Sequence, residues 1–172
     1  MSERFFATCP RGLEAVLAQE LTAVGADKVT VLDGGVGFAG AWPVCYAANL
    51  ESRVASRILW QVGHGRYRSE QDVFELARRL PWHEWSSASQ SIRVDVSAIK
   101  SPLKSLDFTT LRVKDAVCDS FRAREGRRPD VDTKAPDVRI QVFLTADAST
   151  FYLDPSGEPL FKRGYRQSGG EA

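Results

Sequence analysis

Residues 28–44, K-V-T-V-L-D-G-G-V-G-F-A-G-A-W-P-V, hold the pattern that decides the fold of the first part of this chain. β-Branched and apolar residues over 28–32 predict a strand, and the D-G-G run at 33–35 has the composition of a hairpin turn. Residues 36–38 predict the returning strand. The proline directly after Trp42 is typical of the first turn of a helix, so the stretch predicts strand, turn, strand and helix in succession.

Working outward from this stretch in both directions completes a unit of six elements. A short strand over 4–8 precedes a helix that opens after the P-R-G run at 10–12. On the other side, the helix that begins at Trp42 is followed by a strand over 57–62. The order β-α-β-β-α-β is the split arrangement of ferredoxin-like domains. We therefore predict an α+β fold that begins with a ferredoxin-like domain over residues 1–64.

The rest of the chain predicts a second small domain, which a length of 172 residues allows. The glycine-rich residues 63–65 predict a break between the ferredoxin-like unit and the elements that follow. Inward-facing Val113, Ala116, Val117 and Phe121 mark the longest helix, and clean alternation marks the strands. The predicted elements are a helix at 72–80, a strand at 92–96, a helix at 109–125, and paired strands at 138–144 and 151–153.

Positive charge is concentrated locally, because the formal net charge of the whole chain is only +1. Residues 100–128 hold eight Lys or Arg against four Asp or Glu, whereas the first 66 residues hold six of each sign. This asymmetry favours a contact with nucleic acid or another acidic surface, and a solvated helix face is the alternative. The stretch 127–139, R-R-P-D-V-D-T-K-A-P-D-V-R, groups cations with stiffening prolines, which suits a rigid surface for a polyanion.

Several common site types are disfavoured. Cys9, Cys45 and Cys118 are odd in number and widely spaced, so they predict neither a disulfide framework nor a zinc site. The G-x-G-x-x-G match at 35–40 lies in the predicted hairpin instead of between a strand and a helix, which disfavours a dinucleotide site. No signal peptide or membrane-length apolar run is found, so we expect a cytoplasmic protein with no membrane contact. Since these site motifs are disfavoured, we also expect no metal and no catalytic residues.

Cationic side chains of the second half are the candidate RNA contacts, because guanidinium groups grip phosphates and stack on unpaired bases. An aromatic pair on one central strand, as in RNA-recognition motifs, is not found. Base identity is therefore not expected to be read by this segment alone. The candidate RNA-binding residues are Lys100, Lys104, Arg112, Lys114, Arg122, Arg124, Arg127, Arg128, Arg139, Lys162, Arg163 and Arg166.

A series of sequence blocks spans nearly the whole chain: FFATCPRGLE at 5–14, DGGVGFAG at 33–40, SRVASRIL at 52–59, RVKDAV at 112–117, RPDVD at 128–132, PDVRI at 136–140 and KRGYR at 162–166. Their content and order resemble the N-terminal part of the bacterial large-subunit ribosomal RNA methyltransferase L family. The resemblance implies a THUMP RNA-binding domain over residues 65–166 after the ferredoxin-like domain. Residues 167–172 would be a linker towards a methyltransferase domain that this chain lacks.

The family resemblance also implies a function. Family members transfer a methyl group from S-adenosylmethionine to N2 of a guanine in 23S rRNA, and some carry a second, fused methyltransferase that acts at N7. We therefore expect a monomeric, non-catalytic fragment that binds 23S rRNA and positions the substrate. S-adenosylmethionine would bind in the missing catalytic domain, and this fragment would hold no cofactor.

Two other hypotheses remain open from the residues. A small ferredoxin-like hydrolase of the acylphosphatase kind would hold phosphate through Arg11, which directly precedes a predicted helix N-terminus. A protein-interaction adaptor would use exposed Arg and Trp side chains, which are common at interface hot spots.

Overall fold

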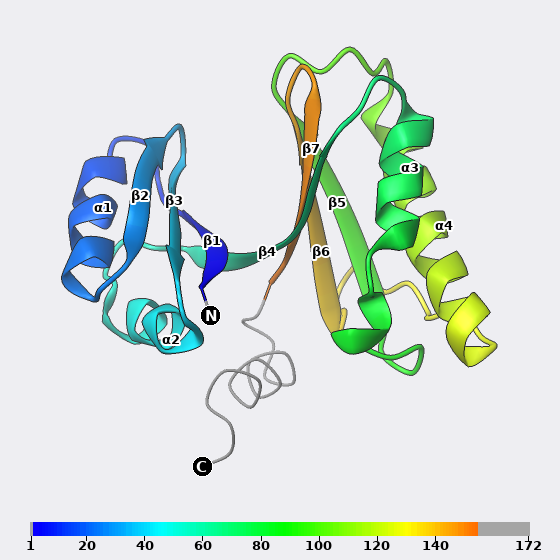
Figure 1. The fold of residues 1–172 in the computed structure, drawn as a ribbon, viewed down its shortest axis with the longest axis horizontal. Coiled ribbons are helices and arrows are strands. Elements are labelled where there is room, and N and C mark those ends of the chain that lie inside the picture. The colour runs from blue at the N-terminus through cyan, green and yellow to red at the C-terminus, as the bar shows by residue number, and fades with distance from the viewer. Residues whose placement is uncertain (1, 155–172) are drawn as a thin grey trace. The chain divides into compact units, whose positions relative to one another are not determined.

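The computed structural model describes residues 2–154. The described chain forms two compact units: unit 1 contains residues 2–61 and Asp154, and unit 2 is Val62–Leu153. Strand β4 passes from unit 1 into unit 2, and every other helix and strand belongs to one unit (Figure 1).

Unit 1 contains the predicted β-α-β-β-α-β order. Its elements are β1 (Glu3–Thr8), α1 (Glu14–Ala23), β2 (Asp27–Leu32), β3 (Gly35–Gly40), α2 (Trp42–Glu51) and the first part of β4 (Arg57–Arg66). The strands lie in the order β2-β3-β1-β4, with antiparallel pairing between β2 and β3, β3 and β1, and β1 and β4. The ferredoxin-like prediction for this part of the chain is confirmed.

An aromatic cluster fills the core of unit 1. The Phe5 ring stacks on Phe38 at a centroid distance of 5.3 Å and meets Trp42 edge-on at 5.4 Å. Trp42 in turn meets Trp60 at 5.1 Å. Such ring pairs add to the stability that comes from burial, so these aromatic side chains join α2 to β1, β3 and β4.

Unit 2 combines the end of β4 with α3 (Glu70–Arg79), a short 3₁₀ turn η1 (Trp82–Glu84), β5 (Ile92–Ala98), α4 (Leu106–Glu125), β6 (Val138–Leu144) and β7 (Ala148–Leu153). Its strands lie in the order β4-β7-β6-β5. β5 and β6 are parallel, and β6 and β7 form an antiparallel hairpin. The connection from β5 to β6 runs through α4, as a parallel pair requires.

The core of unit 2 lies between its sheet and its helices. The four α4 residues predicted to face inward are all at most 1% exposed. Trp82 is also buried, meets Trp85 and Phe151 edge-on, and donates a hydrogen bond of 2.6 Å from Nε1 to the carbonyl of Ala77. The Trp82 and Trp85 pair therefore packs as an anchor in the core of unit 2.

The prediction of a break between elements at residues 63–65 is wrong, because β4 continues through them to Arg66. A Cβ at Gly63 would lie 2.7 Å from a Leu80 methyl, and one at Gly65 would lie 3.0 Å from a Leu76 methyl. These glycines therefore allow α3 and the residue after it to pack closely on the strand. The glycines serve packing and do not interrupt the strand.

The longest helix starts earlier than predicted, at Leu106, because Ser105 caps it. The Ser105 hydroxyl accepts a hydrogen bond of 3.1 Å from the backbone N–H of Phe108. The predicted linker at 167–172 lies outside the described residues. Within the described part of the chain, the helices are too short or too polar to span a lipid bilayer.

Candidate RNA interface

Helix α4 carries four of the twelve candidate RNA-binding residues, and two more follow directly after its end. Over its 20 residues, one stripe is buried, and the chain then turns at Gly126, whose φ of 79° is left-handed. Arg122 and Arg124 lie in the last turn, where a cation is favoured by the helix dipole. That stabilising role is the structural alternative to RNA binding for these two side chains.

Four arginines gather around the end of α4, and we call Arg122, Arg124, Arg127 and Arg128 the α4-end cluster. All four are exposed. Arg124 Nη2 lies 2.6 Å from His83 Nε2, and Arg128 Nη2 forms an ion pair of 3.3 Å with Asp115. Arg122 and Arg127 make neither an ion pair nor a side-chain hydrogen bond with another described residue, so their charges are available to a polyanion.

Helix α3 brings two further arginines to the same end of unit 2. Arg112 near the start of α4 contacts Phe74 of α3, and Arg124 near its end contacts His83 just after α3. The two helices therefore run side by side in the same direction (Figure 1). Arg78 and Arg79 end α3 and are exposed. Sequence reasoning missed this pair, although an R-R dipeptide in the last turn of a predicted helix was the available signal.

Other predicted contacts on α4 are held by neighbours within unit 2. The Arg112 guanidinium lies 4.1 Å from the centroid of the Phe74 ring and donates to Gln71 Oε1 at 2.5 Å. Lys114 Nζ lies 3.8 Å from Asp115 Oδ1. Both side chains are half-buried, so they have less freedom than the α4-end cluster to meet a ligand.

Lys100 and Lys104 lie in the loop that leads into α4, and both are exposed. Lys100 has a left-handed φ of 60°, which is uncommon for a residue with a side chain. The loop is anchored beside it, because the Ser101 hydroxyl lies 2.7 Å from the Tyr67 hydroxyl. These two lysines are therefore presented on a fixed loop, distant in sequence from the α4-end cluster.

The remaining candidates divide between a sheet and the undescribed part of the chain. Arg139 lies on β6, on the sheet face opposite the buried Val138 and Ile140, so it is not brought together with the α4 residues. Lys162, Arg163 and Arg166 lie outside the described residues.

Acids within the 127–139 stretch bind backbone amides. Asp132 Oδ1 accepts hydrogen bonds from the amides of Lys134 and Ala135 at 2.9 and 3.0 Å. These amide hydrogen bonds, that of Ala135 first, lower the pKa of Asp132. Asp137 Oδ2 accepts from the Ser91 amide at 2.9 Å. These two carboxylates shape the turn, and neither forms an ion pair with an arginine of the described chain.

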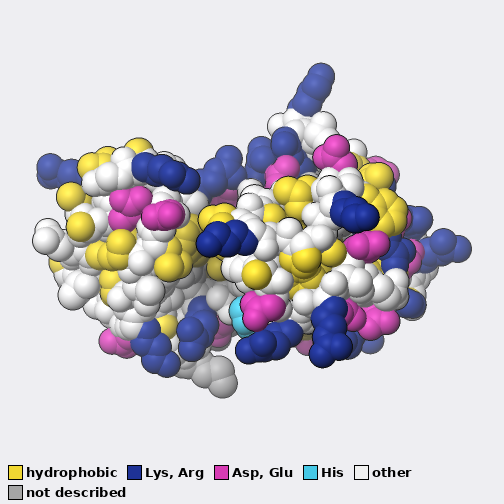
Figure 2. Space-filling model, turned by 90° about the horizontal axis from the view of Figure 1, so that it is seen from above, with side chains coloured by type: hydrophobic (Ala, Val, Ile, Leu, Met, Phe, Trp, Pro, Cys, Tyr) yellow, Lys and Arg dark blue, Asp and Glu magenta, His cyan; other side chains and the backbone are white. Residues whose placement is uncertain are grey.

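Positive and negative side chains are interspersed on the surface. Figure 2 shows Lys and Arg side chains alternating with Asp and Glu side chains across the face that it displays. No single-sign field covers that face, so electrostatic attraction must come from small groups such as the α4-end cluster.

The glycine motif at 35–40 does not form a cofactor site. All of it lies in β3, which pairs with β1 and β2 on its two edges. A Cβ on Gly35 would overlap the Ala7 carbonyl oxygen, and one on Gly40 would lie 3.0 Å from Val44 Cβ. The space beside Gly35 and Gly40 is filled by protein atoms, and both edges of β3 are paired, so this motif fits neither a nucleotide nor S-adenosylmethionine.

The loop before α1 is occupied by a carboxylate of the protein itself. Glu14 accepts hydrogen bonds from the backbone amides of Gly12 at 2.8 Å and Gly34 at 2.9 Å. These amide hydrogen bonds, that from Gly34 first, lower the pKa of Glu14. A substrate phosphate beside Arg11 would have to compete with this carboxylate, which argues against the acylphosphatase hypothesis.

Thiol and metal chemistry find no support in the geometry. Cys9, Cys45 and Cys118 are buried and unpaired. Burial raises the pKa of Cys45 to about 12, so its thiolate is not available near neutral pH. Among residues 2–154, no three His, Cys, Asp or Glu side chains are grouped to hold a metal ion.

Comparison with known proteins defines the class. The family model for the THUMP domain matches residues 67–154, about half of the chain, and the model for the RlmL ferredoxin-like domain matches residues 4–59. The chain therefore belongs to the THUMP domain family. Its first part is an RlmL ferredoxin-like domain, so the predicted fold class and family resemblance are confirmed.

Relatives along the whole chain carry the name ribosomal RNA large subunit methyltransferase K/L. The protein of that name from Aeromonas salmonicida (strain A449) is 41% identical over 170 residues, which is 99% of this chain and 24% of the relative. The one from Syntrophotalea carbinolica is 38% identical over 166 residues, 96% of this chain and 23% of the relative. The chain thus spans about a quarter of the length of these relatives.

A solved structure has a similar fold and is also longer than this chain. The crystal structure of a predicted N6-adenine-specific DNA methylase from Listeria monocytogenes matches with a TM-score of 0.78 and 30% sequence identity. The match covers 99% of this chain and 45% of that one.

Proposed function

We propose that this chain is the RNA-binding, substrate-positioning part of a large-subunit rRNA methyltransferase. The observation that carries the proposal is that the THUMP match, over residues 67–154, contains the α4-end cluster. The names of the relatives specify ribosomal RNA of the large subunit as the substrate. Unit 2 would hold the RNA through phosphate contacts, which give affinity but little sequence information.

The chemistry would belong to the longer protein. Its reaction would be methyl transfer from S-adenosylmethionine to N2 of a guanine in 23S rRNA, outside residues 2–154. We further propose a monomeric protein in the cytoplasm, with domains at 1–64 and 65–166. Methyl incorporation into rRNA by this chain alone, supplied with the methyl donor, would contradict the non-catalytic assignment.

A salt titration tests the RNA-binding role. Filter binding of the whole chain to a 23S rRNA hairpin at increasing salt should show affinity that falls steeply. Replacing Arg122, Arg124, Arg127 and Arg128 with Gln should lower the slope of log affinity against log salt by about 0.7–0.9 for each phosphate that the variant no longer binds. Affinity at low salt should fall about tenfold or more.

The matched control removes the same number of charges from unit 1. Arg4, Arg11, Lys28 and Arg53 are exposed, and their replacement with Gln should change the slope much less. Circular dichroism verifies that both variants fold. No measurable binding by the unaltered chain would overturn the proposal, and unchanged binding by the folded four-arginine variant would remove the α4-end cluster from it.

A further inference from the structure

One face of the unit 2 sheet is covered by helices, and the other carries its own set of polar and aromatic side chains. Helices α3 and α4 lie on the same side of the β4-β7-β6-β5 sheet (Figure 1). Along β6, Val138, Ile140, Val142 and Leu144 are buried, while the alternate residues 139, 141 and 143 are half-buried and project from the opposite side. We call that opposite side the open face.

Strand register places two aromatic residues on the open face. Gln141 pairs with Tyr152, and Phe143 pairs with Thr150. Side chains at paired positions share a face, so Phe143 and Tyr152 are diagonal neighbours on the two middle strands of unit 2. The ring of Phe143 makes no aromatic contact with another described residue. An aromatic pair on central strands is the arrangement on which RNA-recognition motifs stack bases.

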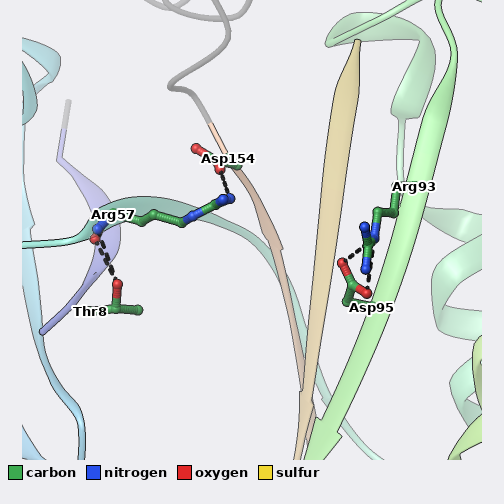
Figure 3. A network of polar contacts seen from close by, with 5 residues as sticks. All are labelled: Thr8, Arg57, Arg93, Asp95 and Asp154. Carbon is green, nitrogen blue, oxygen red and sulfur yellow. Dashed lines mark hydrogen bonds and ion pairs between the residues drawn. The ribbon is translucent and has the colours of Figure 1, made fainter. Parts of the chain in front are cut away.

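The open face also carries two adjacent arginines. Arg93 of β5 pairs in register with Arg139 of β6, and like charges at paired positions destabilise a sheet. The Arg93 charge is balanced by Asp95, because the Arg93 Nε lies 3.0 and 3.2 Å from the two Asp95 oxygens (Figure 3). Arg93 Nη1 also donates to the Thr133 carbonyl at 2.6 Å. Arg139 has no ion pair or side-chain hydrogen bond within the described chain. Its charge is therefore complementary to an anion.

We propose that the open face binds an unpaired segment of RNA, with a base stacked on Phe143 and a phosphate held by Arg139. Tyr152 provides a second ring beside the first. The two anchoring residues are about 13 Å apart along β6, because Phe143 lies four positions after Arg139 on the strand. They therefore contact different nucleotides of one extended strand. This inference rests on the proposed RNA-binding function and names the structural class of RNA that unit 2 selects.

The open face differs from the α4-end cluster in what it can discriminate. Phosphates are present in duplex and single-stranded RNA alike, so the α4-end cluster accepts both. A stacking platform requires bases that are not already paired, so the open face selects single strands. Together the two surfaces would direct the protein to rRNA that is locally unpaired.

A pair of ring substitutions tests this inference on the whole chain. The probe is a fluorescein-labelled single-stranded RNA of about 12 nucleotides, within the range of known single-strand sites. Phe143→Leu keeps an apolar side chain but removes the ring, and should weaken binding about tenfold. Phe143→Trp restores a ring and should bind within about twofold of the unaltered chain, since a stacking role predicts rescue. Arg139→Gln should weaken binding of the same probe and lower its salt dependence.

Matched controls separate stacking from folding and from charge. Phe108 of α4 is 49% exposed, and Phe108→Leu removes a ring elsewhere on unit 2, so it should leave binding unchanged. Binding of inorganic polyphosphate should be the same in Phe143→Leu as in the unaltered chain, because polyphosphate has no bases. Circular dichroism melting verifies that each variant folds.

The outcomes of this test and of the function test are distinct. If the unaltered chain binds RNA but Phe143→Leu and Phe143→Trp bind equally well, the open-face inference is overturned and RNA binding stands. An equal loss in Phe143→Leu and Phe143→Trp, with both folded, also overturns stacking. If the unaltered chain binds neither the hairpin nor the single strand, both proposals fail.

Discussion

The two units differ in how their charged side chains are arranged. In unit 1, Glu14 binds the amides of Gly12 and Gly34, and Glu20 binds the Ser52 hydroxyl at 2.6 Å. Its aromatic side chains pack on one another. Cations without an ionic partner in the described chain occur in both units. Those of unit 1 come from four separate segments, at Arg4, Arg11, Lys28 and Arg53, whereas Arg122 and Arg127 of unit 2 lie together at one helix end.

This difference indicates where a ligand is needed. A group satisfied internally gains little from a partner, whereas an unpaired cation gains a charge-assisted hydrogen bond when a phosphate arrives. The grouping of unpaired arginines at the end of α4 therefore distinguishes unit 2 from unit 1. Substitutions in each unit can sharpen or break the contrast.

The largest effect is expected from Gly35→Val in unit 1. A Cβ at Gly35 would overlap the Ala7 carbonyl oxygen and lie 2.5 Å from Phe6 Cζ, so β3 would have to move away from β1. We expect a loss of about 3 kcal/mol in the free energy of unfolding of unit 1. Hydrogen exchange measured by mass spectrometry should show faster exchange in β1 and β3 peptides, and unchanged exchange in β6.

Gly37→Ala is the matched control within the same strand. The nearest atom to a Cβ at Gly37 is the Phe5 carbonyl oxygen at 4.0 Å, an ordinary contact distance. The control should leave exchange in unit 1 almost unchanged. Equal damage from both substitutions would mean that glycine is needed along β3 for a reason other than close approach to β1.

The next largest effect is expected from breaking an ion pair in unit 1, which is compared with breaking one in unit 2. Arg57 Nη1 lies 2.6 Å from Asp154 Oδ2, and the Asp154 side chain is 1% exposed (Figure 3). Arg57→Ala would remove this charge-assisted contact with a buried carboxylate and should cost about 2 kcal/mol of unfolding free energy. The pair between Arg66 and Asp147 in unit 2 is exposed on both sides, so Arg66→Ala should cost less than about 0.5 kcal/mol.

Urea denaturation of the two variants provides the comparison. A similar loss from Arg57→Ala and Arg66→Ala would contradict the expectation that burial of the carboxylate decides the cost. Arg57 also donates its backbone amide to Thr8 Oγ1, a bond that the alanine variant retains. The expected loss therefore reports the side chain alone.

A smaller effect is expected at the start of α4 in unit 2. The Ser105 hydroxyl accepts from the Phe108 amide, and Ser105→Ala should reduce stability by about 1 kcal/mol. Ser105→Asp is the control, because its carboxylate can accept the same hydrogen bond and should preserve most of the stability. Thermal denaturation checks both variants. Equal melting temperatures for Ser105→Ala and the unaltered chain would show that the cap contributes nothing.

Local patterns in the sequence predicted most of the fold. Hairpin composition at 33–35 and helical spacing over 113–121 each depend on neighbours in sequence, and both predictions are confirmed. The glycines at 63–65 were misinterpreted because their role depends on Leu76 and Leu80, whose contact with the strand is set by tertiary packing. A turn and a close helix-to-strand contact both favour glycine, so residue type alone could not separate them.

The candidate site was less accessible to sequence reasoning. Charge counting found the α4-end cluster, but it could not show that Arg112 is held by Phe74 while Arg122 remains unpaired within the described chain. Phe143 and Tyr152 come from two strands, so their pairing appears only when the hairpin register is known. Sequence reasoning had sought an aromatic pair on a single strand and therefore missed it.

The smallest effect is a pH dependence at Glu14. The amide hydrogen bonds, that from Gly34 first, hold the pKa of Glu14 below its ordinary value of 4.5. A carboxyl group with a lowered folded-state pKa stabilises the protein above its ordinary pKa, and this contribution disappears as pH falls through the folded-state value. Glu14→Gln should therefore melt at a lower temperature than the unaltered chain near about pH 7, and the difference should shrink towards about pH 3.

The corresponding substitution in unit 2 is Asp132→Asn, because the amides of Ala135 and Lys134 lower the pKa of Asp132. Both carboxylates are exposed to solvent screening, so shifts of only a few degrees are expected in either unit. The Glu14 carboxylate joins the loop at Gly12 to the hairpin at Gly34, whereas the Asp132 carboxylate accepts from the amides two and three positions ahead. The Glu14 variant should therefore show the greater pH dependence. A difference that is constant from neutral to acid pH would show that the Glu14 charge is not what binds those amides.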